Sequence, residues 1–314
     1  MKYVPLISIA MATYNGEKFL AKQLDSIYKQ TYTNIEVIVN DDCSTDRTIE
    51  ILEQYSKSHG LKYYLNSKNL GFLKNFEKVI SLCMGDFIAL ADQDDIWEKN
   101  KLEILWSKLD SNLLIHSDCK IIDENNQIIN DSWKQADGYL CNMDNLFFRN
   151  VVTGCTILFN TDLLKTALPF PNNLVYHDWW LALCAAKQQK IVYTPLCLTR
   201  YRQHIGQDTG YGNNKKIFIL KRVYLNIKYK YYKIDFHRTI AYKKHLNNLI
   251  ALQNSPKCIE NSNLFLTEVI NYFSDYVKHT VHLKTFFIGL KYHKIVYPKK
   301  NPFFIKNILL DIIG

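Results

Sequence analysis

Short apolar runs alternate with helix-like segments through the first hundred residues, and this alternation constrains the fold more than any other feature. Residues 6–12, 35–39, 62–65 and 85–90 are predicted to be strands, because they are short and rich in apolar, β-branched or aromatic residues. Strands that are joined through helices form crossover units, so a largely parallel α/β sheet is expected. The predicted helices span residues 18–30, 47–58, 72–84 and 98–109.

Three of these strands end in polar or acidic residues. Thr13-Tyr14-Asn15 follows the first strand, Asp41-Asp42 the second, and Asp92-Gln93-Asp94-Asp95 the fourth. Ligands of parallel sheets bind beyond the carboxyl ends of the strands, so these residues are predicted to meet at one edge. The chain has neither G-x-G-x-x-G nor G-x-x-x-x-G-K-[ST], which argues against a Rossmann dinucleotide site and a Walker phosphate loop.

The acidic turn at residues 92–95 suggests a metal site. Clustered carboxylates repel one another and are costly to bury, unless a cation is held between them. Mg²⁺ or Mn²⁺ fits best, because these ions take oxygen ligands and often bridge carboxylates to phosphates. The alternative is a solvated turn before the next helix, with Asp95 near the helix N-terminus. The turn alone favours neither reading, but the acids at the preceding strand end favour the metal.

Asp42 is predicted to contact a nucleotide base. A uracil or thymine ring presents an N3–H donor, and an ionised carboxylate can only accept. The alternative role is capping of the following helix together with Ser44 and Asp46. The base contact is favoured because two adjacent acids exceed what a cap requires.

Asp178 is predicted to be a general base. It lies in the stretch His177-Asp178-Trp179-Trp180 and opens a predicted amphipathic helix, where the N-terminal end favours a carboxylate. In-line displacement at an anomeric carbon needs a base on the acceptor hydroxyl and a positive group near the departing diphosphate. The alternative is a helix cap, with the two tryptophans in the core.

The order and spacing of these motifs resemble family 2 glycosyltransferases of the GT-A fold over residues 5–210. Residues 7–52 resemble the N-terminal half of that family, and Asp92–Asp95 resembles its metal-binding DxD element. The stretches 69–72 and 92–97, together with Asn75, are similar to bacterial rhamnosyltransferases and related polysaccharide enzymes. The resemblance implies a GT-A type sheet, mostly parallel and flanked by helices, with a basic helical C-terminal region.

The resemblance also implies roles for individual residues. Asp94 becomes the direct metal ligand, Asp92 faces the ribose or the metal's outer shell, and Asp178 falls at the family's catalytic acid position. Tyr201-Arg202-Gln203-His204 resembles the stretch that closes the donor site, so Arg202 and His204 are expected to contact the diphosphate or to complete the metal shell. The implied nucleotide-sugar site comprises Ala12, Thr13, Tyr14, Asn15, Asp42, Asn75, Asp92, Gln93 and Arg202.

Three other positions qualify this resemblance. Gln207 stands where the family usually has Asn, which puts the role of that loop in doubt. The QxxRW signature of processive synthases is absent, which argues against a cellulose or hyaluronan synthase. Residues 152–156 either line the sugar pocket or form a glycine bend before a strand, and the sequence favours neither.

Charge divides the chain into two predicted parts, a catalytic domain over residues 1–212 and a basic, aromatic-rich helical region over residues 213–314. Residues 211–314 hold 18 lysines and arginines against five acids, whereas residues 1–210 hold 21 against 25. A basic region suggests an anionic partner, and an anionic membrane surface is expected. The alternative is a small helical subdomain that packs on the catalytic domain, and both readings can hold together.

No apolar run of about 18 residues exists and the N-terminus lacks a signal-peptide pattern, so we expect a cytoplasmic protein, peripheral on the inner face of the cell membrane. The scattered cysteines contain no C-x-x-C pair, which indicates small buried residues in a reducing compartment.

These features favour an inverting, metal-dependent glycosyltransferase that moves a sugar from a UDP- or dTDP-sugar to a hydroxyl of a bacterial surface glycan or lipid-linked precursor. A nucleotidyltransferase is a second possibility, but the first strand is followed by a single glycine and not by a glycine-rich phosphate loop. The third possibility is a nucleic-acid-binding protein that uses the basic C-terminal region; we do not expect nucleic acid as a partner.

Overall fold

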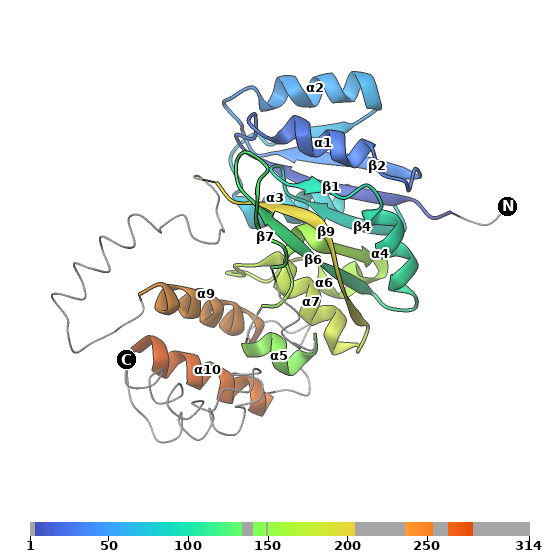
Figure 1. The fold of residues 1–314 in the computed structure, drawn as a ribbon. Helices are drawn as coiled ribbons and strands as arrows, with labels where there is room; N and C mark the ends of the chain where they lie inside the picture. Colours follow the sequence, from blue (N-terminus) through green and yellow to red (C-terminus); the bar gives the residue numbers. More distant parts are fainter. Residues whose placement is uncertain (1–3, 134–140, 149, 205–235, 254–262, 279–314) are drawn as a thin grey trace.

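The computed structural model describes residues 4–133, 141–148, 150–204, 236–253 and 263–278 (Figure 1). One mixed sheet runs through the catalytic part, with the strand order β3-β2-β1-β4-β8-β6-β9-β5 and with β7 paired to β6. Helices cover both faces of this sheet, so the predicted α/β class is confirmed.

The first half of the sheet is parallel, as predicted. It contains β1 (Ile7–Thr13), β2 (Ile35–Asp41), β3 (Lys62–Leu65) and β4 (Phe87–Ala91). Thr13 lies opposite Asp41, and Asp41 lies opposite Leu65, so the carboxyl ends of three strands stand in register. This register brings the polar strand ends to one edge of the sheet.

The helices of residues 20–109 lie on opposite faces of the sheet. They are α1 (Leu20–Tyr28), α2 (Thr48–His59), α3 (Phe72–Ser81) and α4 (Lys101–Leu109). The buried side chains of α1, α2 and α4 join one core, and those of α3 join the other. The helical spacing of the buried residues on α3, Phe76, Val79 and Ile80, explains why this helix presents one apolar face to the sheet.

The second half of the sheet is mixed. It contains β5 (Ile96–Trp97), β6 (Leu114–Ile122), β7 (Ile128–Asn130), β8 (Ile157–Asn160) and β9 (Ile191–Arg202). A turn joins β6 to β7, and Asn126 adopts a positive φ of 67° there. The two-residue strand β5 was not predicted.

Helix α7 (His177–Lys187) corrects one prediction. It was expected to be amphipathic, but every residue from His177 to Ala186 except Asp178 is buried. The reason is that further elements cover it: α5 (Met143–Phe148), α6 (Leu164–Ala167) and the short 3-10 helix η2 (Thr161–Leu163) all contact α7. The other 3-10 helix, η1 (Gly154–Thr156), leads into β8 and is the predicted glycine bend.

Two described helices belong to the C-terminal region, α9 (Phe236–Gln253) and α10 (Asn263–Lys278). They pack against each other and next to α5 (Figure 1). Their buried side chains, among them Leu249 and Val269, share the core that lies under α3 and α7. Among the described residues, no helix is long and apolar enough to cross a membrane. The loop around Gln207 and most of the basic region lie outside the described residues.

Candidate functional site

The ends of β1 and β2 are joined by hydrogen bonds to the Asp41 carboxylate. Its Oδ2 accepts from Thr13 Oγ1 at 2.8 Å and from Ser44 Oγ at 2.6 Å, while its Oδ1 accepts from the Ser44 amide at 2.8 Å. Asp46 Oδ1 accepts from the Thr48 amide at the start of α2. Asp46 therefore accepts from the first residue of α2, whereas Asp41 holds the loop that precedes this helix.

Asp42 instead holds the loop before α3. Its Oδ1 accepts from the Leu70 amide at 2.7 Å and from Asn66 Nδ2 at 2.8 Å, and its Oδ2 accepts from the Gly71 amide at 2.8 Å. The side chain is buried, and Gly71 adopts a positive φ of 79° that favours glycine. A carboxylate offers about four acceptor positions, so three hydrogen bonds leave one for a ligand.

Asn75 lies behind this loop and is 2% exposed. Its Nδ2 donates to the Asn40 carbonyl at 2.9 Å, and its Oδ1 accepts from Asn66 Nδ2 at 3.1 Å. The predicted ligand residue therefore sits where it supports the Asp42 loop through Asn66.

Gln93 ties the acidic turn to the end of β1. Its Oε1 accepts from the Tyr14 amide at 2.9 Å, and its Nε2 donates to the Tyr14 carbonyl at 3.0 Å. A Cβ on Gly16 would meet Gln93 Oε1 at 2.4 Å, so a side chain at this position would have to displace the end of Gln93 from Tyr14. Asn15 has a positive φ of 49°, and its side chain accepts from the Thr45 amide. The structure thus brings the predicted 12–15 segment and the acidic turn together.

Arg202 and His204, at and beyond the end of β9, reach the same turn. His204 Nε2 lies 2.8 Å from Asp94 Oδ2. Arg202 Nε donates to the Asp94 carbonyl at 2.6 Å, and the Arg202 amide donates to Asp95 Oδ1 at 3.0 Å. The guanidinium is buried and lies over the Phe19 ring at 4.5 Å. Arg202 therefore supports the turn from inside the protein, whereas His204 stands beside the predicted metal ligand.

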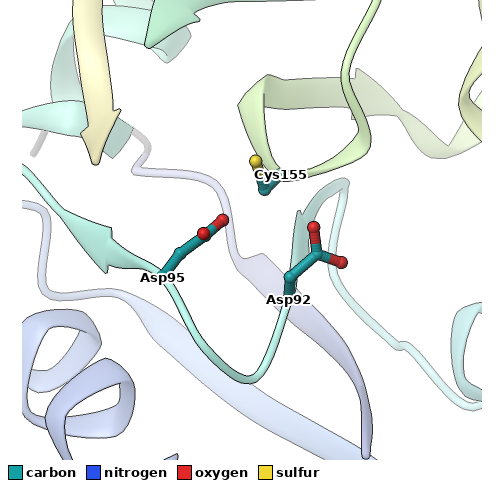
Figure 2. A group of neighbouring side chains, drawn as sticks. All are labelled: Asp92, Asp95 and Cys155. Carbon is teal, nitrogen blue, oxygen red and sulfur yellow. The ribbon is translucent and has the colours of Figure 1, made fainter. Parts of the chain in front are cut away.

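Asp92, Asp95 and Cys155 face a common space (Figure 2). Their oxygen and sulfur atoms lie within 4.8 Å of one another. Burial, together with the charges of the neighbouring acids, raises the pKa of Asp92 well above its usual value and that of Asp95 to about 7. Burial also raises the pKa of the Cys155 thiol, so this group stays protonated. Crowded carboxylates with raised pKa values are what an absent cation would relieve.

The side chains at the acidic turn include the ligand types that Mg²⁺ and Mn²⁺ prefer. Carboxylate oxygens from Asp92 and Asp94, with an imidazole nitrogen from His204, suit Mg²⁺ or Mn²⁺, whereas a protonated thiol does not. A buried ammonium already lies on the Cys155 side, because Lys101 Nζ donates to the Cys155 carbonyl and, at 2.9 Å, to Thr199 Oγ1. Asp92 and Asp95, whose carboxylate oxygens lie within 4.8 Å of each other, are therefore the acids placed to share a hard cation, and Asp94 stands on the same turn beside His204.

Asp178 opens α7 and faces η1. Its Oδ1 accepts from Asn150 Nδ2 at 3.0 Å and from the Trp179 amide at 2.6 Å, and its Oδ2 accepts from the Gly154 amide at 3.1 Å. The Asp178 charge contributes to the raised pKa of Asp92, so the two carboxylates are close enough to interact. Sequence reasoning missed Asn150, because an isolated asparagine carries no signal.

His177 is a further residue whose setting the sequence did not indicate. Its ring stacks on Phe76 with a centroid distance of 4.2 Å and an interplanar angle of 15°, and Phe72 lies 5.0 Å away. Neither ring nitrogen has a hydrogen-bond partner among the described residues. Burial lowers the pKa of His177 to about 3, so the ring is neutral at pH 7.

Comparison with known proteins identifies relatives of this chain. The sequence profile of the family described as "Glycosyl transferase family 2" matches residues 8–165. A dTDP-rhamnosyl transferase, RfbG of Shigella flexneri, is 27% identical over 260 residues, which cover 76% of this chain and 83% of RfbG.

Two solved structures have the same fold. The S. aureus protein TarS, residues 1–349 with UDP-GlcNAc, aligns with a TM-score of 0.57 and 17% identity over 98% of this chain and 88% of that one. The mannosyltransferase PcManGT from Pyrobaculum calidifontis, with GDP-Man and Mn²⁺, aligns with a TM-score of 0.59 and 14% identity over 98% and 79% of the two chains.

Proposed function

Because the chain belongs to glycosyl transferase family 2, and is by that membership a glycosyltransferase, we propose that it is an inverting, metal-dependent enzyme. It would move a sugar from a UDP- or dTDP-sugar to a hydroxyl of a bacterial surface glycan or a lipid-linked precursor. One observation carries this proposal: Asp42, the acidic turn and Asp178 face one edge of the sheet, although they come from three separate segments.

The donor is assigned from the Asp42 site. The acceptor position that remains on this carboxylate suits the N3–H of uracil or thymine. The neighbouring 12–15 segment, which Gln93 fixes to the acidic turn, would lie along the nucleoside. TarS was solved with UDP-GlcNAc, and RfbG is described as a dTDP-rhamnosyl transferase, so both support a pyrimidine nucleotide.

The diphosphate is assigned to the acidic turn. The carboxylates of the acidic turn would hold Mg²⁺ or Mn²⁺, with His204 beside Asp94. When bound, the ion offsets the charge that develops on the departing diphosphate. Arg202 fixes the backbone of the turn, and we assign it to this support and not to diphosphate contact. PcManGT, solved with Mn²⁺, supports the choice of metal.

Asp178 would take the proton from the acceptor hydroxyl. Three N–H donors orient its carboxylate. Attack on the face of the sugar opposite the diphosphate would invert the anomeric carbon in one step. A side chain at Gly154 would crowd His177 and Asp178. The glycine therefore lets the backbone amide of residue 154 come close enough to donate to the Asp178 carboxylate.

A donor panel tests the proposal. UDP-glucose, UDP-galactose, UDP-N-acetylhexosamines and dTDP-rhamnose are each supplied with Mn²⁺ or Mg²⁺, and release of nucleoside diphosphate is measured. Asp178→Asn keeps the shape of the side chain but cannot accept a proton at neutral pH, so turnover should collapse while donor binding survives. The exposed Asp144→Asn on α5 is the matched control. Full activity of the wild type in EDTA would refute the metal assignment.

The basic C-terminal region is proposed to hold the enzyme on an anionic membrane surface, where lipid-linked acceptors are found. Each lysine or arginine near such a surface contributes roughly 1 kcal/mol, and the effect decays within a Debye length. Residues 211–314 carry 18 of these residues against five acids. Sedimentation of the full chain with anionic but not neutral liposomes, and its release by salt, is the expected result. Equal binding to both kinds of liposome would contradict it.

A further inference from the structure

The C-terminal helix α9 contacts α5 through a buried histidine. His245 Nε2 donates to the Phe147 carbonyl at 2.6 Å. Its ring lies edge-to-face with the Trp179 ring and with the Phe273 ring of α10, at centroid distances of 5.6 Å and 5.0 Å. Burial lowers the pKa of His245 to about 4, so the ring is neutral and its one N–H serves the carbonyl.

A second buried side chain of α9 contacts the segment before α7. Asn248 is 0% exposed, and its Oδ1 accepts from the Val175 amide at 2.7 Å. Its Nδ2 has no hydrogen-bond partner among the described residues. The hydrogen bond to Val175 is therefore the one polar interaction that the structure gives this amide, in a place where an apolar residue would be the ordinary choice.

These two contacts fall on the two segments that hold Asp178. Phe147 lies three residues before Asn150, which donates to Asp178, and Val175 lies three residues before Asp178 itself. Trp179 joins the segments, because its Nε1 donates to the Leu146 carbonyl at 2.7 Å. His245 and Asn248 therefore form hydrogen bonds with the two segments, residues 146–150 and 175–179, that position Asp178.

We propose that α9 is part of the catalytic apparatus, with Asn248 and His245 as positioning residues that fix Asp178 through the 146–150 and 175–179 segments. This inference rests on the proposed role of Asp178 as the base. An error of about 1 Å in the place of a reacting group can lower a rate about a hundredfold. Loosening the junction is therefore expected to act on turnover more than on donor binding.

The test compares four variants of the full-length protein. Asn248→Leu removes the acceptor and keeps the number and branching of the side-chain heavy atoms, and Asn247→Leu makes the same change at the exposed neighbouring residue. Leu249→Ala weakens the apolar packing of the same helix and leaves the hydrogen bonds of His245 and Asn248 in place. Asn248→Asp keeps the acceptor oxygen. Each variant is assayed for kcat and donor KM below its melting temperature, and for hydrogen exchange at the Val175 amide.

Asn248→Leu should lower kcat by roughly tenfold to a hundredfold with donor KM little changed, and the Val175 amide should exchange faster. Asn248→Asp should recover part of the lost kcat, whereas Asn247→Leu and Leu249→Ala should retain it. The inference is overturned if Asn248→Leu matches Asn247→Leu in both kcat and exchange, or if Leu249→Ala lowers kcat equally. A failure of the proposed function would be recognised separately. In that case Asp178→Asn would keep its turnover, or the wild type would use none of the donors.

Discussion

The buried His177 allows a prediction in which the sign and the size both follow from the structure. Burial lowers its pKa to about 3, against an ordinary value of 6.5. Between pH 6.5 and pH 3, His177 therefore binds a proton in the unfolded chain but not in the folded chain. The free energy of unfolding consequently falls as the pH is lowered through this window. At pH 5 the loss from this one group is about 2 kcal/mol, and at pH 8 it is close to zero.

His177→Phe removes this loss. The new ring has nearly the same shape and can keep the stacking on Phe76. No hydrogen bond among the described residues is broken, because neither ring nitrogen has a partner there. Replacing an unpaired polar group by an apolar one of the same shape is neutral or stabilising. At pH 8 the free energy of unfolding of the variant should equal or exceed that of the wild type. At pH 5 the difference in favour of the variant should be larger by about 2 kcal/mol.

Urea unfolding at pH 8, 6 and 5 measures the difference directly. The control is His59→Phe, since His59 is exposed on the last turn of α2, where its ring contacts Tyr28 and Tyr55. The change in stability between pH 8 and pH 5 is compared for the wild type, for His177→Phe and for this control. If His177→Phe loses as much stability as the wild type between pH 8 and pH 5, then His177 protonates normally in the folded protein. Its ring would then not be shielded from water.

Three further predictions concern the site. Gly154→Ala places a Cβ 3.1 Å from His177 Nε2, so it should displace the His177–Asp178 pair and lower kcat several-fold with little change in the melting temperature. Asp42→Asn replaces one of the two carboxylate oxygens by an NH2 donor, which then faces either the Leu70 or the Gly71 amide; this should loosen the loop and raise donor KM at least tenfold, as measured by nucleotide titration. Mn²⁺ added to the chelator-treated protein should raise its melting temperature, and Asp94→Ala should remove this rise; an unchanged rise in the variant would place the ion elsewhere.

The sequence predicts the parallel half of the sheet and its reactive edge well, for a physical reason. β-branched runs specify the strands locally, and the crossover connections force successive strands to point the same way. The ends of β1, β2 and β4 must therefore meet at one edge, whatever the details of packing. This rule brings together Thr13, Asp42 and Asp94 without any knowledge of the rest of the chain.

The supports of these residues could not be predicted, because they come from distant segments with no local signal. Asp42 was expected to be free for a base, but the amides of residues 70 and 71 already occupy much of it. Arg202 was expected at the diphosphate, but its backbone and side chain hold a turn that lies more than a hundred residues earlier in the sequence. Helix α7 was expected to show one polar face, because the elements that bury its other side are known only from the fold.

The same reasoning changes the interpretation of the C-terminal region. Its charge pointed to a membrane surface, and charge is a property that sequence reports directly. The contacts of α9 are different, because they depend on a few uncharged side chains, such as His245 and Asn248, that meet the 146–150 and 175–179 segments only in three dimensions. The two roles are compatible, since the lysines of a helix can face outward while its buried face holds the catalytic loop. A region with both roles would link binding of the enzyme to an anionic membrane surface with the position of Asp178.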